Sequence, residues 1–393
     1  MNPDSVIFVE RIVPNYRVPF FLGLHEALNK QDICLRVLGG KCLPQEHLVD
    51  AIHELPFGEQ IHNIYFHHGI YLQQGLHDHI KGIRLIITGQ ENRALSINRL
   101  LLQQQFSQII PPIAFYDHGP VADTKSISSA VNYAVKKALS LRANWWFAYT
   151  EISKCRLIRC GFDPSRITVA NNAIDTKQIL AAQQHADLMQ LTSSYNKLFN
   201  DNISDIQKVI IGIVCMRLVA GKKVDFLLST LDFIHKEVEN FRMLIIGEGT
   251  KKQVIQNYCS TRPWCKYLGA LYGGERIPYF VLADCWLNPG TVGLTILDAF
   301  ASSAPLFTTT SSHHGPEIAY LKNNINGVIA NSSISQYAQS VITVIKDPCT
   351  LRHMQDAAGQ AALKYSLSAM VLNFSSGVME ALRKARHSTL SPK

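Results

Sequence analysis

Short apolar runs alternate with helical patterns along most of the chain. The first apolar run covers residues 6–9, and a helix that starts at Pro19 follows it. Further runs of strand type cover 33–38, 63–66, 83–88, 113–116, 145–149 and 167–169, and helical spacing covers 92–105, 126–141 and 151–160. Gly161 is suited to cap the last of these helices. The alternation predicts a parallel sheet covered by helices.

Residues 176–208 interrupt this pattern, because they are polar and helix-prone and contain no strand pattern. We therefore predict an irregular helical connection there. The alternation then resumes with a strand at 209–214. Later strands are predicted at 243–246, 265–268, 285–287 and 306–309, and helices at 226–238, 251–259 and 276–282. A long amphipathic helix with a basic end is predicted for 368–386.

The elements predict an α/β protein with two successive doubly wound, Rossmann-like domains. We place the domains at 1–175 and 209–365, joined by the connection at 176–208 and followed by a C-terminal helix and basic tail at 366–393. A chain of 393 residues suits two domains of this size. Ligands of such sheets bind at the carboxyl ends of the strands, so we expect the active site in a cleft between the domains.

Composition narrows the class of protein. Hydrophobic residues make up 47% of the chain and charged residues 17%, which is typical of a globular protein. No apolar run is long enough to span a membrane, and the N-terminus resembles a first strand more than a signal peptide, so we expect a cytoplasmic protein. The formal charge of +8 is not gathered in a dense basic stripe, which disfavours nucleic acid and suits an anionic small ligand or an acidic membrane surface.

Cysteine and histidine patterns argue against metal. The nine cysteines include no Cys-x-x-Cys pair, so we expect buried, reduced thiols. A histidine-rich stretch at 62–79 matches no ligand spacing, and we predict no metal site.

The stretch at 287–305 has the pattern of a strand, a glycine-containing turn and a helix. The small residues of the turn let a ligand approach the backbone, and a helix start attracts phosphate. Asp298 falls about one turn into the helix, where its carboxylate could accept hydrogen bonds from ribose hydroxyls. Taken alone, the pattern suits an ordinary strand-helix turn equally well.

Two cations follow the strand at 209–214. Arg217 and Lys222 are placed to clamp a diphosphate and to neutralise its charge as it leaves, with Lys223 as a substitute for Lys222; a solvated loop is the alternative. Gly247 opens a second strand-end turn, Gly-Glu-Gly. No Gly-x-Gly-x-x-Gly fingerprint or Walker loop is present, which counts against a dinucleotide site and ATP hydrolysis.

Other candidates follow predicted strands. His118 ends the strand at 113–116, although a hydrogen-bonded structural histidine is the commoner reading. Glu317 is a candidate partner of a sugar or phosphate loop, or otherwise a helix-start carboxylate. Residues 126–147 join basic residues to Trp145 and Trp146; this segment could rest on anionic lipid, but such tryptophans more often lie in a core.

Taken together, these segments resemble the family 4 glycosyltransferases. The resemblance rests on PNYRVPFF at 14–21, AYTEISKCRLIRCGFDPSRITVANNAIDT at 148–176, RLVAGKKVDFLL at 217–228, IIGEG at 245–249, YLGALYGGERIPYFVLADCWLNPGTVGLTILDAFASSAP at 267–305 and PEIAYLKNNINGVI at 316–329. These six segments occur in the family's order over nearly the whole chain. They resemble its motifs for both domains.

The resemblance implies a GT-B fold and a retaining transfer of a hexose from a UDP- or GDP-sugar, without a metal or other cofactor. The acceptor would be a glycan or a lipid-linked molecule, in cell-surface polysaccharide synthesis, at a cytoplasmic or peripheral membrane location. Arg217, Lys222 and His118 would be catalytic, and Tyr16 and Arg17 would face the acceptor. The donor-binding positions implied are Gly247, Gly290, Thr291, Val292, Gly293, Leu294, Asp298 and Glu317.

The chain departs from the family at its two-glutamate motif. The first glutamate maps onto Gly290 and the second onto Asp298. These changes leave open a catalytically silent GT-B protein that binds nucleotide sugar or a partner enzyme. An epimerase or a phosphorylase of the same architecture is a further alternative.

Overall fold

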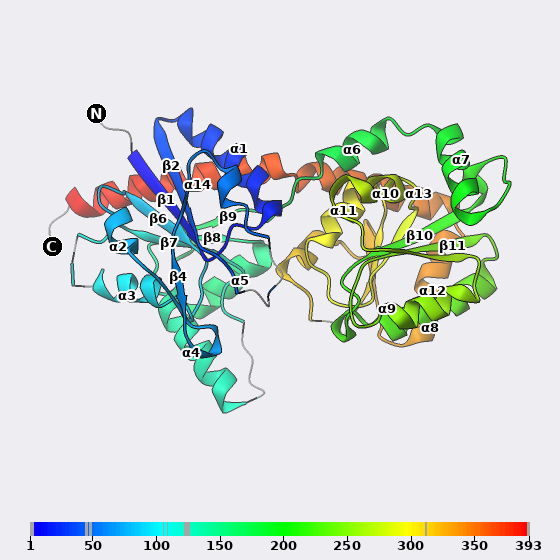
Figure 1. Ribbon diagram of the computed structural model, residues 1–393, viewed down its shortest axis with the longest axis horizontal. Coiled ribbons are helices and arrows are strands. Elements are labelled where there is room, and N and C mark those ends of the chain that lie inside the picture. Colours follow the sequence, from blue (N-terminus) through cyan, green and yellow to red (C-terminus); the bar gives the residue numbers. More distant parts are fainter. Residues whose placement is uncertain are drawn as a thin grey trace. The chain divides into compact units, whose positions relative to one another are not determined.

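The computed structural model describes residues 4–43, 46, 49–104, 106–107, 109–121, 126–310 and 313–390. The chain forms two compact units (Figure 1). One unit combines Met1–Ile174 with Leu367–Lys393, and the other is Asp175–Ser366. The chain therefore leaves the first unit, completes the second and returns to the first.

The first unit is built on a parallel sheet with the strand order β3-β2-β1-β6-β7-β8-β9. Its strands are β1 (Asp4–Glu10), β2 (Ile33–Gly39), β3 (Gly58–Gln60), β6 (Leu85–Thr88), β7 (Ile113–Asp117), β8 (Trp145–Ala148) and β9 (Ile167–Val169). Its helices are α1 (Val18–Asn29), α2 (Leu76–His79), α3 (Leu95–Gln103), α4 (Ile127–Ser140), α5 (Glu151–Cys160) and α14 (Leu367–Leu390).

One predicted strand lies outside this sheet. Residues Asn63–Tyr65 form β4, which pairs antiparallel with β5 (Tyr71–Gln73) in a separate hairpin. The side-chain amide of Asn63 donates to the carbonyls of Arg11 and Lys41, which fixes β4 beside the loops that follow β1 and β2.

The C-terminal helix is an integral part of the first unit, which corrects our expectation of a separate terminal segment. Phe374 of α14 stacks on Phe147 of β8, with ring centroids 4.0 Å apart. Met370 accepts a hydrogen bond through sulfur from the Ala173 amide at 3.1 Å. A side chain at position 377 would lie 2.5 Å from Thr168 Oγ1, so Gly377 lets the helix approach β9 closely.

The second unit has a parallel sheet with the order β12-β11-β10-β13-β14-β15. Its strands are β10 (Ile210–Cys215), β11 (Phe241–Ile246), β12 (Cys265–Gly269), β13 (Cys285–Leu287), β14 (Leu306–Thr309) and β15 (Gly327–Ala330). Its helices are α6 (Lys177–Gln184), α7 (Leu188–Phe199), α8 (Val224–Glu237), α9 (Lys252–Ser260), α10 (Ile277–Val281), α11 (Thr295–Ala301), α12 (Ile334–Ile345) and α13 (Pro348–Lys364). The predicted connection contains α6 and α7, which group with this unit.

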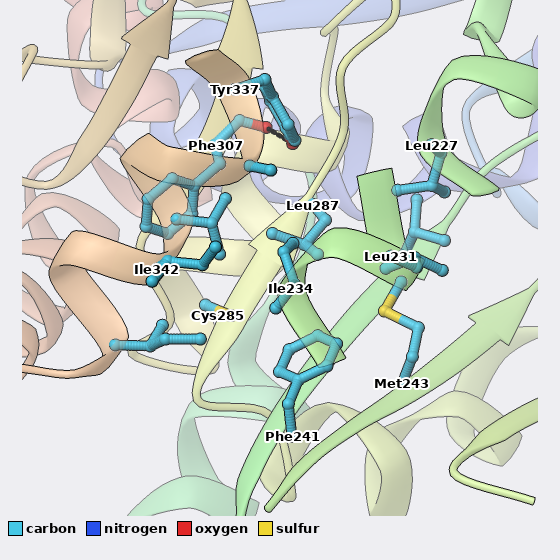
Figure 2. Close-up of a cluster of buried hydrophobic side chains, with 14 of the residues drawn as sticks. Leu227, Leu231, Ile234, Phe241, Met243, Cys285, Leu287, Phe307, Tyr337 and Ile342 are labelled. Carbon is cyan, nitrogen blue, oxygen red and sulfur yellow. Dashed lines mark hydrogen bonds between the residues drawn. The ribbon is translucent and has the colours of Figure 1, made fainter. Parts of the chain in front are cut away.

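The core of the second unit lies between its sheet and the helices α8 and α12. Figure 2 shows Leu227, Leu231 and Ile234 of α8 facing side chains of the strands. The buried Tyr337 hydroxyl donates to the Phe307 carbonyl at 3.0 Å, so the one polar group of this ring is paired inside the core. Burial of these apolar side chains is the main source of stability for the sheet. The sheet in turn holds the loops at the carboxyl ends of its strands, which are described below.

The burial of the tryptophans and cysteines can also be compared with what the sequence predicted. Trp145 and Trp146 are buried, as a core role predicts. All nine cysteines lie in described segments and carry no disulfide, but only Cys160, Cys265 and Cys285 are buried, so the expectation of generally buried thiols was wrong. Within the described residues, no helix has the length and apolar character needed to cross a bilayer.

Candidate functional site

In both sheets the strand order reverses beside the first strand of the unit. β10 lies between β11 and β13, and β1 lies between β2 and β6. Loops that leave two such neighbouring strands turn to opposite faces of the sheet, which leaves a crevice at the carboxyl ends. In the second unit these loops carry Arg217 after β10 and Gly290 after β13.

Gly290 packs directly against the backbone of Lys222. A Cβ atom at position 290 would lie 2.5 Å from the carbonyl carbon and oxygen of Lys222. The loops after β10 and β13 therefore touch through their main chains, and no side chain fits between them. This contact gives a physical reason for a glycine where the family pattern has its first glutamate.

The two predicted cations have different surroundings. Arg217 is exposed, and its guanidinium makes no hydrogen bond or ion pair with any residue that the structure describes. Lys222 is partly buried, and Nζ donates to the Thr291 carbonyl at 2.5 Å. Burial, with repulsion from Arg217, lowers the pKa of Lys222. Lys223, which we considered as a substitute for Lys222 in binding the diphosphate, instead donates to Thr309 Oγ1 at 3.0 Å.

A histidine that the sequence did not single out holds the glycine loop in place. The Val292 amide donates to Nδ1 of His314 at 3.1 Å, and His314 Nε2 donates to the Thr309 carbonyl at 2.8 Å. Burial, together with the nearby Lys223 and Lys222, lowers the pKa of His314, so the ring stays neutral. The amide of Val292, one of the donor-binding positions that the resemblance implies, is thus engaged within the protein.

Asp298 is buried and pairs with a residue that the sequence reasoning missed. Its Oδ2 lies 3.7 Å from Nη1 of Arg276, and only 6% of the residue is exposed. Burial raises the pKa of Asp298 to about 6, although Arg276 opposes that shift. Arg276 lies just before α10 and also stacks over Phe280. A ribose that used Asp298 would have to approach this ion pair.

The pKa of Asp298 predicts how stability depends on pH. Because the folded value of about 6 exceeds the ordinary value of 3.8, Asp298 favours folding most below about pH 4, and this contribution is lost as the pH rises to about 6. The loss is about 3 kcal/mol in the free energy of unfolding. Asp298→Asn should remove it, as measured by urea unfolding followed through tryptophan fluorescence and far-UV circular dichroism across that range.

Asp284 provides the matched comparison for this experiment. Burial raises its pKa to about 6 as well, and its Oδ2 accepts from the Ile211 amide at 2.8 Å. Asp284→Asn should therefore remove a separate part of the same pH dependence. A pH profile of Asp298→Asn that runs parallel to that of the wild type would contradict the assignment for Asp298.

The remaining donor-side positions lie beside the same loops. Glu317 is buried, and a Cβ atom at Gly315 would lie 2.7 Å from its Oε2 and 3.2 Å from the Val292 carbonyl. Gly247 has a φ of +147°, and a Cβ atom there would lie 1.9 Å from the Met216 carbonyl oxygen. The glycine at 247 is therefore required by the loop after β10, whether or not a ligand binds.

The first unit has a second polar site at its own strand-order reversal. Arg17 follows β1 in a 3-10 turn, is 8% exposed, and has a guanidinium carbon 5.3 Å from the ring centroids of Tyr16 and Tyr116. Its Nη1 is buried and has no hydrogen-bond partner in the part of the chain that the structure describes. Such a donor is costly to leave unpaired. The surrounding cavity has a volume of about 230 Å³, and Tyr149 and Glu10 also line it.

Acidic groups adjoin this cavity. Burial raises the pKa of Glu10 to about 8, against the attraction of Arg17, so its carboxyl group is mainly protonated at neutral pH. His118 Nδ1 donates to the carboxylate of Asp117, which leaves Nε2 for another partner. Burial opposes ionisation of Asp117, but His118 and Lys136 hold its pKa below the ordinary value. The site therefore offers donors and acceptors beside aromatic rings, as hydroxyl-rich ligands require.

A comparison with known protein families matches the part of the chain that contains the second-unit site. Residues 208–347, which contain both of its loops, match the family model described as glycosyl transferases group 1. The chain is 23% identical over 199 residues to the alpha-monoglucosyldiacylglycerol synthase of Acholeplasma laidlawii. That match covers 49% of this chain and 47% of the relative, so the chain spans about half of that protein's length.

Solved structures are similar over nearly the whole chain. HepE of Anabaena, solved in complex with UDP, is 13% identical, with a TM-score of 0.68 over 96% of this chain and 100% of that one. A glycosyltransferase of Rickettsia africae is 15% identical, with a TM-score of 0.68 over 98% of this chain and 99% of that one. The chain has the GT-B fold. The prediction of the fold class from the sequence is therefore confirmed, whereas the roles assigned to individual site residues stay predictions.

Proposed function

We propose that the chain is a glycosyltransferase that moves a hexose from a UDP- or GDP-sugar to a hydroxyl group of a glycan or lipid-linked acceptor. We further propose the retaining, metal-independent reaction of family 4 enzymes. One observation carries the proposal. Arg217, whose guanidinium has no partner among the described residues, and the neighbouring Lys222 lie at the strand-order reversal of the second unit, against a glycine loop, inside the segment that matches the glycosyl transferases group 1 model.

The donor diphosphate is the natural partner of Arg217. An exposed guanidinium without a protein partner can bind two phosphate oxygens at once, and it can neutralise the charge that develops as the nucleotide leaves. Lys222 adds a second positive charge nearby, and its contact with the Thr291 carbonyl fixes where that charge lies. Together, Arg217 and Lys222 supply the electrostatic stabilisation that a metal ion provides in other transferases.

The acceptor side of the proposal rests on the cavity in the first unit. A sugar hydroxyl can accept from Arg17 Nη1 and can exchange a hydrogen bond with Glu10 in either protonation state. The rings of Tyr16 and Tyr149 offer apolar faces for a sugar ring. We place the acceptor hydroxyl near His118, which Asp117 orients.

A second candidate is a silent protein that binds nucleotide sugar without transferring it. The burial of Asp298 and its pairing with Arg276 favour this candidate, since they leave the position of the family's second glutamate with little accessible carboxylate. Donor binding without turnover would support this alternative.

Thermal unfolding with UDP, GDP and ADP, each with and without EDTA, tests the donor site. A nucleotide at about 100 times its dissociation constant should stabilise the second unit by about 2.7 kcal/mol, which raises its midpoint by about 5–10 °C. The shift should occur with one base and persist in EDTA. Release of the nucleotide from its sugar conjugate then separates a transferase from a silent binder. If no nucleotide shifts the midpoint, the proposed donor site is wrong.

A further inference from the structure

Helix α4 of the first unit presents its apolar side to solvent. None of the residues 128–138 is buried. The exposed apolar positions are Ala130, Val131, Ala134, Val135 and Ala138, a spacing that places them along one face of the helix. Val131 is 58% exposed and Val135 45%, and Leu141, directly after the helix, is 38% exposed. We call this set, with Leu141 included, the α4 stripe.

The polar side of α4 is the side attached to the rest of the unit. Lys136 Nζ lies 3.5 Å from Oδ2 of Asp117 in β7. The Tyr133 hydroxyl contacts the sulfur of Cys160 at 3.7 Å, and the Asn132 side chain accepts from Asn92 at 2.6 Å. A surface helix normally packs its apolar side inwards. Leu139, near the end of α4, is buried in the core of the unit, but the other contacts named here are polar, and the α4 stripe has no partner among the described residues.

Positive charge surrounds the stripe. At about 100° per residue, Lys137 falls on one margin of the α4 stripe, and Arg142 follows Leu141 just beyond the end of the helix. Neither pairs with a carboxylate of a described residue, and Arg142 instead donates to the Ala138 carbonyl at 3.0 Å. Residues 126–160 contain six basic residues and one acidic residue. Figure 1 shows α4 extending past the sheet at the lower edge of the first unit.

We propose that α4 docks the first unit on a membrane surface that contains anionic lipid. The α4 stripe lies in the boundary between headgroups and acyl chains, and Lys137 beside the stripe and Arg142 at its end reach the phosphate layer. A helix of 14 residues is too short to span a bilayer, so it lies in the plane of the surface. A second copy of the chain fits less well, because it would bring two strongly basic segments together.

Vesicle sedimentation of the full chain tests this docking surface. The protein should bind phosphatidylcholine vesicles that contain one third phosphatidylglycerol and bind vesicles of phosphatidylcholine alone far more weakly. Val131→Asp combined with Val135→Asp should weaken binding to the anionic vesicles at least about tenfold, since both apolar contacts are lost and negative charge is added. Leu372→Asp on α14, at a side chain that is 64% exposed, is the matched control and should bind like the wild type.

The charged margins are tested separately. Lys137→Gln combined with Arg142→Gln should weaken binding to the anionic vesicles by about 30-fold, and added salt should weaken the wild type in the same direction. Equal binding by these variants and the wild type overturns the proposal. A wild-type dimer in sedimentation velocity that Val131→Asp dissociates also overturns it, in favour of a second copy. Stabilisation by nucleotide should be unchanged in every variant, so failure here leaves the proposed donor site intact.

Discussion

Replacing Gly290 by alanine is expected to destabilise the second unit by about 3 kcal/mol, because the added methyl group meets the Lys222 backbone at 2.5 Å. Main-chain atoms in two connected loops cannot yield as the end of a flexible side chain can. For a unit of this size, that loss lowers the midpoint of thermal unfolding by about 6–12 °C. Gly290→Glu, which restores the residue of the family pattern, should be at least as harmful. Differential scanning calorimetry measures both.

Gly293→Ala is the matched control for this substitution. It lies three residues further along the same loop, and a Cβ atom there has no neighbour within 4 Å. Its midpoint should stay within a degree or two of the wild type. If Gly290→Ala and Gly293→Ala were equally stable, the loops would be free to separate, and the close contact would not explain the glycine.

Arg217→Ala is expected to abolish nucleotide-induced stabilisation and to slow transfer by about 10²–10³-fold, the usual effect of removing one charge-stabilising group. The unliganded protein should unfold at an unchanged temperature, because the exposed guanidinium has no partner among the described residues. Lys222→Ala should weaken nucleotide binding too, but it should also cost about 1 kcal/mol of stability through its lost bond to Thr291.

Lys346→Ala serves as the control for both cations. This exposed lysine pairs with Glu237 at 3.3 Å, between the ends of α12 and α8, and its loss should affect neither nucleotide binding nor transfer. An Arg217→Ala protein that is stabilised by nucleotide as strongly as the wild type would remove Arg217 from the donor site. The control and the two cation variants are all measured as purified proteins with the same nucleotide titration.

Local patterns were sufficient to predict most of the sheets. The long apolar strands β1, β2, β10 and β11 and the capped helix α5 occur where their periodicity placed them. The sequence reasoning missed β3, β5 and β15, which are three or four residues long and too short to show alternation. It also misplaced β4, because pairing in a hairpin or in the central sheet depends on which partner strand is near, and that is decided by tertiary contacts.

The site was predictable only in part, for a related reason. Arg217, Lys222 and Gly290 were selected as candidates because each lies in a loop that follows a predicted strand. The pairing of Arg276 with Asp298 and the clamp of His314 on Val292 join positions 22 residues apart, and no local motif marks either contact. The bounds of α4 were predicted within one residue, but the direction of its apolar side was not. That direction depends on Asn92, Asp117 and Cys160, which belong to three other segments.

The return of α14 to the first unit has a consequence for synthesis of the protein. A ribosome releases Met1–Ile174 first, yet Phe374, which stacks on Phe147 and lies 5.9 Å from the ring of Phe8, emerges only after all of Asp175–Ser366. The aromatic surface of the first unit is therefore uncovered while the second unit is being made. The second unit, whose chain is continuous, can finish folding before the first, so the part of the protein translated earlier is the part completed later.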